Sequence, residues 1–240
     1  PSCSMYPINT CEQRNNHFQD ITGTVRTAVH ILAHDYGDSV AQELLHRSIM
    51  STREDASRIK VRSVCFLNGG MIPGVHRPVF IQKVLASPIG FIVTRFMNKR
   101  SFGKRFSAVF GRQPTKQELD EFWSILVHNN GLRVQSYLIQ YMNERVRNKT
   151  VWVDALRNSK APLCLIDGPC DPVSGIHLAE AVADIWEIEP SYADHAEMGK
   201  RTVVILPSQF GHYPQVECPS MVLSHFYCFM ESNFPELFQT

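Results

Sequence analysis

The stretch ILAHDYGDSVAQELL, residues 31–45, contains an aspartate at the point where the sequence pattern changes from strand to helix. Val29, Ile31 and Ala33 belong to a short apolar run, which predicts a buried strand. After Asp35, apolar residues recur at the spacing of one helix face, at positions 40, 44, 45 and 49. The sequence therefore places Asp35 in a strand–turn–helix connection, where it either caps the helix or attacks a substrate.

The composition indicates a globular domain without a strong charge bias. The chain has 240 residues, of which 44% are hydrophobic, and this is enough for one sizeable core with an inserted subdomain. The formal net charge is +1, so no long-range field favours a nucleic acid partner. We interpret the basic run RVRNK at 145–149 as the solvated end of a helix. The seven cysteines are scattered and form no CxxC pair, which argues against a disulfide framework or a zinc site.

No stretch approaches the roughly 20 apolar residues of a membrane-spanning helix, and no signal peptide is recognisable. The chain begins with Pro1 rather than Met, so we expect a fragment or a processed product. His30 and His34 are four residues apart, but they lie in a predicted strand and lack a third ligand nearby. We expect no metal and no cofactor. Cys65 and Cys164 lie inside apolar runs and are expected to be core thiols.

The remaining elements predict an α/β fold with a parallel sheet flanked by helices. We expect an irregular lead-in at 1–20, a first part of the core at 21–71, a helical cap at 72–158 and a second part of the core at 159–240. Short apolar strands are predicted at 61–70, 162–168 and 202–207, with helices at 176–187 and 218–233. Inside the cap, Thr115 and Glu118 form a capping-box pattern, and a further helix is predicted over 133–146.

Three polar residues directly follow predicted strands: Asp35, Asp171 and His212. In a parallel sheet they lie at the carboxyl ends of the strands, where open α/β folds form their sites. The chain order of nucleophile, acid and histidine is the one that hydrolases with a nucleophile elbow use. A carboxylate is ionised at neutral pH and can attack a saturated carbon to form an ester. His212, oriented by Asp171, would activate the water that hydrolyses this ester, and the backbone N–H of Tyr36 would stabilise the oxyanion.

The motifs HDYGDSVAQELL, LNGG with HRP after it, GPCDPV and GHYPQVECP occur in this order. Over residues 21–240 the chain resembles the α/β-hydrolase group that contains epoxide hydrolases and haloalkane dehalogenases. The resemblance implies an eight-stranded core, a helical cap, a hydrolase activity and an association with the endoplasmic reticulum. It also implies a His-Gly loop upstream of the nucleophile, which supplies a second oxyanion donor.

This chain departs from that pattern at its start. Only 34 residues precede Asp35, no His-Gly loop is among them, and about four strands of the family's sheet have no counterpart. A partial sheet would expose a long edge and much apolar surface. We therefore expect the N-terminal strands to be missing and the chain alone to be poorly stable or inactive. Any membrane association is expected to depend on the missing N-terminal region.

Each candidate residue also has a structural interpretation. Asp35 and Asp38 could both be residues of a helix start, and we prefer this interpretation for Asp38. Asp171 could form a simple turn before Pro172, which would leave Asp167 as the acid. Tyr137 and Tyr141 lie one helical turn apart. The resemblance implies that such cap tyrosines hydrogen-bond the epoxide oxygen as the ring opens, although ordinary cap packing explains the same pattern.

The leading hypothesis is a hydrolase that forms an ester on Asp35, with small apolar substrates that are epoxide-like or derived from lipids. Haloalkane dehalogenases usually carry Trp after the nucleophile, and Tyr36 departs from that. A second hypothesis is an inactive hydrolase-fold protein that binds a lipid or a protein partner. A serine esterase is a weaker alternative, because no serine lies at the elbow.

Overall fold

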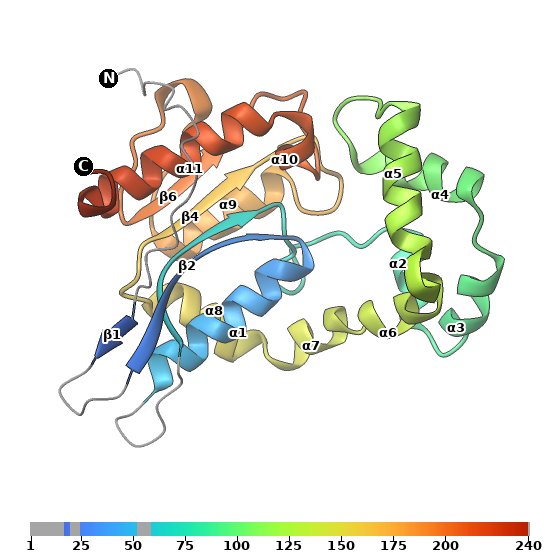
Figure 1. Cartoon of the computed structure of the whole chain (residues 1–240), viewed down its shortest axis with the longest axis horizontal. Helices are drawn as coiled ribbons and strands as arrows, with labels where there is room; N and C mark the ends of the chain where they lie inside the picture. Colours follow the sequence, from blue (N-terminus) through green and yellow to red (C-terminus); the bar gives the residue numbers. More distant parts are fainter. Residues whose placement is uncertain (1–16, 20–24, 52–58, 240) are drawn as a thin grey trace.

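The computed structural model describes residues 17–19, 25–51 and 59–239 (Figure 1). Residues 1–16 and 20 of the predicted irregular lead-in lie outside these ranges. Within that lead-in the structure has a short strand, β1 (His17–Gln19), which pairs antiparallel with β2 (Val25–His34). The lead-in is therefore not irregular throughout.

The described strands form one sheet in the order β1-β2-β3-β4-β6-β5. From β2 onward all neighbours are parallel, through β3 (Ile59–Leu67), β4 (Leu163–Asp167), β6 (Arg201–Ile205) and β5 (Ser191–Tyr192). The predicted parallel sheet flanked by helices is confirmed. The sequence pattern did not predict β5, because two residues are too few to show a period.

Helices pack on both faces of this sheet, so alternate residues of each strand enter two separate cores. On one face lie α1 (Tyr36–Met50), α8 (Lys149–Asn158) and α9 (Ile176–Trp186). On the other face lies α11 (Pro219–Asn233), preceded by α10 (Pro214–Glu217). Cys65 and Cys164 point to the α11 face as fully buried free thiols, which confirms their predicted core position.

The segment between β3 and β4 is helical and lies mostly beside the sheet (Figure 1). It contains α2 (Phe80–Ala86), α3 (Gly90–Val93), α4 (Lys99–Phe106), α5 (Lys116–Val127), α6 (Gln135–Leu138) and α7 (Tyr141–Arg147). Short 3-10 turns are η1 (Thr94–Phe96), η2 (Ser107–Val109) and η3 (His128–Val134), with η4 (Ala193–His195) and η5 (Pro235–Leu237) later in the chain. None of the helices in the described ranges is long and apolar enough to cross a bilayer.

The cap contains the predicted capping box and ends in contact with the core. At the start of α5, the Glu118 amide donates to Thr115 Oγ1 over 3.1 Å and the Thr115 amide donates to the Glu118 carboxylate over 2.7 Å, as the capping-box pattern predicted. The last helix of the predicted cap range, α8, packs against α1 and α9 of the core. The boundaries at 72 and 158 stay predictions.

The single helix predicted over 133–146 is wrong. The structure has η3, α6 and α7 there, with a break between Leu138 and Tyr141. At this break the Gln140 side chain donates to the carbonyl oxygens of Ser136 and Ala86, so α6 is held against α2 rather than continued into α7. The break puts Tyr137 and Tyr141 on different helices, and they do not share a face.

Candidate active site

The turn between β2 and α1 holds Asp35 in a backbone conformation that residues other than glycine rarely adopt. Its φ is 49° and its ψ is −107°, and its side chain makes no capping hydrogen bond to α1. The Asp35 amide donates to the Leu67 carbonyl of β3 over 3.3 Å, which fixes the turn to the neighbouring strand. Because a strained residue persists only where its surroundings enforce it, the geometry favours a functional role for Asp35 over the capping role.

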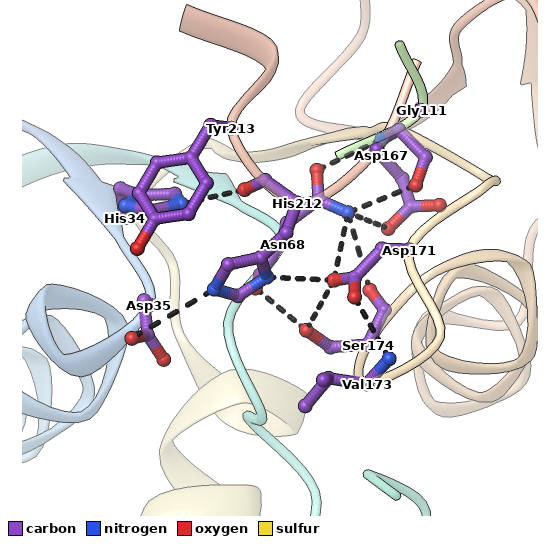
Figure 2. A network of polar contacts seen from close by, with 12 residues as sticks. His34, Asp35, Asn68, Gly111, Asp167, Asp171, Val173, Ser174, His212 and Tyr213 are labelled. Atoms are coloured by element: carbon purple, nitrogen blue, oxygen red, sulfur yellow. Dashed lines mark hydrogen bonds and ion pairs between the residues drawn. The ribbon is translucent and has the colours of Figure 1, made fainter. Parts of the chain in front are cut away.

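The three predicted residues Asp35, Asp171 and His212 lie together at the carboxyl ends of β2, β4 and β6 (Figure 2). His212 Nδ1 is 2.7 Å from Asp171 Oδ2, and Nε2 is 3.8 Å from Asp35 Oδ2. The imidazole therefore bridges the two carboxylates, with its Nδ1–H donated to Asp171. The backbone N–H of Tyr36 lies at the first position of α1, where the helix supplies no acceptor for it.

Asp171 is held by a buried hydrogen-bond network (Figure 2). Its Oδ1 accepts from the Val173 amide over 2.7 Å, and its Oδ2 lies 2.9 Å from Ser174 Oγ. Asn68, just after β3, lies at the centre of this network. Its Nδ2 is 3.3 Å from Asp171 Oδ2 and 3.0 Å from the Gly168 carbonyl oxygen, and its Oδ1 accepts from the Gly168 amide over 2.8 Å. The network aims the Asp171 carboxylate at His212.

The alternative acid, Asp167, lies at the end of β4 and is fully buried. One of its oxygens is 3.3 Å from Asn68 Nδ2 and the other has no hydrogen-bond partner. Burial, together with the charge of Asp171, raises the pKa of Asp167 well above its usual range. His212 Nδ1 is hydrogen-bonded to Asp171 and not to Asp167, so the geometry favours Asp171 as the acid.

The charges at the site are coupled through His212. Burial alone would raise the pKa of Asp35, but the contact and charge of His212 and the charge of Arg145 hold it well below its usual range. Burial alone would lower the pKa of His212, but Asp171 and Asp35 raise it to about 10. In the resting site at neutral pH, a protonated His212 therefore lies between two ionised carboxylates.

His34 holds the loop that carries His212. Its Nε2 lies 2.7 Å from the His212 carbonyl oxygen, and its ring contacts that of Tyr213 at 4.9 Å between centroids. Burial and the nearby charge of His212 lower the pKa of His34 to about 4, so it is neutral and its Nε2–H can donate this bond. Among the residues that the structure describes, no cluster could hold a metal ion.

Two side chains of α7 reach the elbow from the cap. The Tyr141 hydroxyl donates to Asp35 Oδ1 over 3.3 Å. Arg145 is 2% exposed, so its predicted position on a solvated helix end is wrong. Its Nε donates to Ser39 Oγ over 2.6 Å and its Nη2 donates to the Asp35 carbonyl oxygen over 3.1 Å. Tyr137, the other predicted cap tyrosine, is 74% exposed on α6 and does not reach the site.

Asp35 and His212 line a pocket of about 540 Å³ that lies between the sheet and the cap. Most of its other lining residues are apolar, and they come chiefly from the cap: Val79, Ile81 and Leu85 of the α2 region, Met97, Phe102 and Phe106 around α4, and Phe122 of α5. The side chain of Asp35 is 31% exposed. A carboxylate at the base of an apolar pocket is suited to an apolar small molecule with one reactive centre.

Comparisons with known proteins agree with this geometry. No protein-family model matches the chain. It is 34% identical to the mesoderm-specific transcript protein of Mus musculus over 219 residues, which are 88% of this chain and 60% of the relative. It is 35% identical over 203 residues to a Mycobacterium tuberculosis protein provisionally named hydrolase LipZ, covering 83% of this chain and 64% of the relative. The chain thus spans about 60% of the length of the curated relatives that it matches.

Solved structures with the same fold include the haloalkane dehalogenase DatA of Agrobacterium tumefaciens C58. It is 17% identical, with a TM-score of 0.57 over 83% of this chain and 65% of the other. The epoxide hydrolase CorEH is 14% identical, with a TM-score of 0.53 over 85% of this chain and 68% of the other. The chain therefore has the α/β-hydrolase fold. The resemblance that the four sequence motifs indicated is confirmed at this level.

The sequence predicted the three residues that the structure brings together, Asp35, Asp171 and His212, but not the residues that support them. Asn68 gave a signal, since it is a polar residue directly after a strand and before two glycines, and its φ of 40° is one that asparagine tolerates. Arg145 gave a weaker one, since it lies four residues after Tyr141 and shares its helix face. Ser39 and Ser174 gave none.

Proposed function

We propose that the chain carries the active site of a hydrolase that forms an ester on Asp35, with epoxides as the substrate class. The observation that carries this proposal is the imidazole of His212, which bridges Asp171 and a strained Asp35 at the base of an apolar pocket. No serine lies at the elbow, and this argues against a serine esterase.

In the first step an oxygen of Asp35 attacks one epoxide carbon, and the bond from that carbon to the ring oxygen breaks. The ester forms, and Asp35 loses its negative charge. The Nε2 proton of His212 passes to the alkoxide, because the loss of the Asp35 charge lowers the pKa of the imidazolium. The Tyr141 hydroxyl, which contacts Asp35 in the resting site, hydrogen-bonds the ring oxygen as it gains charge.

In the second step water adds to the ester carbonyl carbon and gives a proton to Nε2 of His212, which is now neutral. The Tyr36 N–H stabilises the oxyanion. The tetrahedral intermediate then collapses, the alkoxide leaves with the proton of the added hydroxyl, and a vicinal diol is released. Asp35 is again a carboxylate and His212 again an imidazolium, so protons and charges return to the resting state.

The test is intact-mass measurement of the His212→Gln variant after incubation with a panel of epoxides and haloalkanes. Gln cannot act as a base, so the ester should accumulate and peptide mapping should find the adduct on Asp35. The matched control is the double variant with Asp35→Asn, which should form none. The haloalkanes test Asp35 without the acid role of His212, because a halide leaves without a proton. If the folded variant forms no adduct with any compound, haloalkanes included, Asp35 is not a nucleophile and the pocket is a binding site only.

A further inference from the structure

The cap contains a long segment of unbalanced positive charge. From residue 77 to residue 112 the sequence has eight Lys or Arg residues and no Asp or Glu. The whole chain has a net charge of only +1, so the remaining residues are net negative and the positive charge is concentrated in the cap. Charge separated in this way indicates an anionic partner on the cap side of the molecule.

Most of these cations are available to such a partner. Lys99 pairs with Asp120 at 2.8 Å and Arg112 pairs with Glu118, both on α5. Within the described parts of the chain, the other six cations have no ion-pair partner, and all of them are exposed. They are Arg77, Lys83, Arg95, Arg100, Lys104 and Arg105.

The same elements expose large apolar side chains. Phe80 on α2 is 80% exposed and Phe96 on η1 is 78% exposed. Helices α2, α3 and α6 pack against one another and η1 follows α3, so these residues belong to one region of the cap (Figure 1). We call this region the cap face, defined by Phe80, Ile89, Phe91, Ile92, Phe96 and Tyr137. Scattered apolar residues are ordinary on a surface, whereas a group on adjoining elements marks an interaction site.

We propose that the cap face docks on a lipid membrane that contains anionic lipids. Phenylalanine and isoleucine side chains beside lysine and arginine are the combination that inserts at a headgroup boundary while neutralising anionic headgroups. A nucleic acid duplex would be bound through the cations and would leave the phenylalanines in water. Helix α2 supports the lipid surface in particular, because Phe80 and Lys83 are exposed while Ile81, Gln82 and Leu85 line the apolar pocket. The cap face is thus one helix away from a pocket suited to apolar molecules.

The test is cosedimentation of the chain with vesicles of phosphatidylcholine alone and of phosphatidylcholine with about one quarter phosphatidylserine. We expect binding to the anionic vesicles, weak binding to the neutral ones, and a fall in affinity as salt rises from about 0.05 M to about 0.5 M. The variants Lys83→Glu/Arg95→Glu and Phe80→Ser/Phe96→Ser should each lose at least about tenfold in affinity.

Matched controls come from exposed residues far from the cap. Lys160→Glu/Lys200→Glu makes the same change of charge on the core, and Leu223→Ser/Tyr227→Ser removes two partly exposed apolar side chains there. Both variants should bind vesicles as the unchanged chain does. Circular dichroism checks that every variant is folded. Equal losses of vesicle binding in the cap and control variants would overturn the proposal. It would also be overturned if the chain bound no vesicles but bound RNA or self-associated, and the cap variants abolished that binding. Asp35→Asn should bind vesicles normally, so this outcome is independent of the proposed hydrolysis.

Discussion

Arg145 connects the cap to the strained turn, and its replacement tests whether that connection matters. In Arg145→Met an apolar chain of similar length replaces the guanidinium. The variant loses the bond to Ser39 Oγ, the bond to the Asp35 carbonyl oxygen and the contact at 4.5 Å with the ring of Tyr141. Both hydrogen-bond acceptors are left in a buried site without their donor.

The size of the effect follows from these contacts. Each hydrogen bond from a charged donor contributes about 1.5–3 kcal/mol. The substitution also removes the cost of desolvating the guanidinium, which offsets part of this loss. We therefore expect the free energy of unfolding to fall by about 2–4 kcal/mol in total. Arg145 also helps to hold the pKa of Asp35 low, and its contacts orient the turn. The rate of ester formation on Asp35 should therefore fall by at least about tenfold, which corresponds to only about 1.4 kcal/mol.

The assays are urea unfolding and the initial rate of epoxide opening. The matched control is Arg147→Met on the same helix, whose side chain is exposed and should change stability by less than about 0.5 kcal/mol. Arg145→Lys keeps the charge but cannot make both hydrogen bonds, so its stability and its rate should lie between those of Arg145→Met and of the unchanged chain. The reasoning fails if Arg145→Met unfolds within about 0.5 kcal/mol of the unchanged chain, or if it opens epoxides at the same rate.

Two further predictions concern the core of the site. A Cβ at Gly69 would lie 2.1 Å from Asp38 Oδ2, so Gly69→Ala should lower the free energy of unfolding by about 1–3 kcal/mol. A Cβ at Gly37 would make an ordinary 3.7 Å contact with Ala33, so Gly37→Ala should raise it by about 0.5–1 kcal/mol. Thermal unfolding of the two variants measures both changes. His212 has a folded pKa of about 10 against about 6.5 unfolded, so its stabilisation is complete below about pH 6.5 and is lost as the pH rises towards 10. We expect the free energy of unfolding to fall more steeply with pH across that range in the unchanged chain than in His212→Gln. Parallel curves of this free energy against pH would contradict the prediction.

The parts of the site that sequence predicted are those that local pattern determines. Asp35, Asp171 and His212 each follow a strand, and a parallel sheet brings the carboxyl ends of its strands together whatever the intervening sequence. The capping box at Thr115 and Glu118 is likewise local, because both partners lie within one turn. Both kinds of prediction needed only the type and order of the elements.

The errors arise where distant segments decide the outcome. Arg145 lies in a basic run that locally resembles a solvated helix end, and its burial results from the approach of α7 to the turn at Asp35. The helix over 133–146 breaks at Gln140, whose side chain bonds to Ala86, 54 residues away along the chain. Such contacts leave no period in the sequence, so pattern analysis extended the helix through the break.

Contact with the His212 imidazole separates the carboxyl groups whose pKa is lowered from those whose pKa is raised. Burial acts on all four aspartates near the elbow, but only two have the imidazole of His212 within 4 Å: Asp35 and Asp171. At Asp38, burial outweighs the nearby charge of Arg145 and raises the pKa well above its usual range, and burial does the same at Asp167. The predicted helix-start role of Asp38 does not explain this burial. The charges of Asp171 and Asp35 hold the proton on His212, and in the proposed reaction an ester on Asp35 would remove one of them. In the proposed mechanism, this single charge change at Asp35 would convert His212 from acid to base.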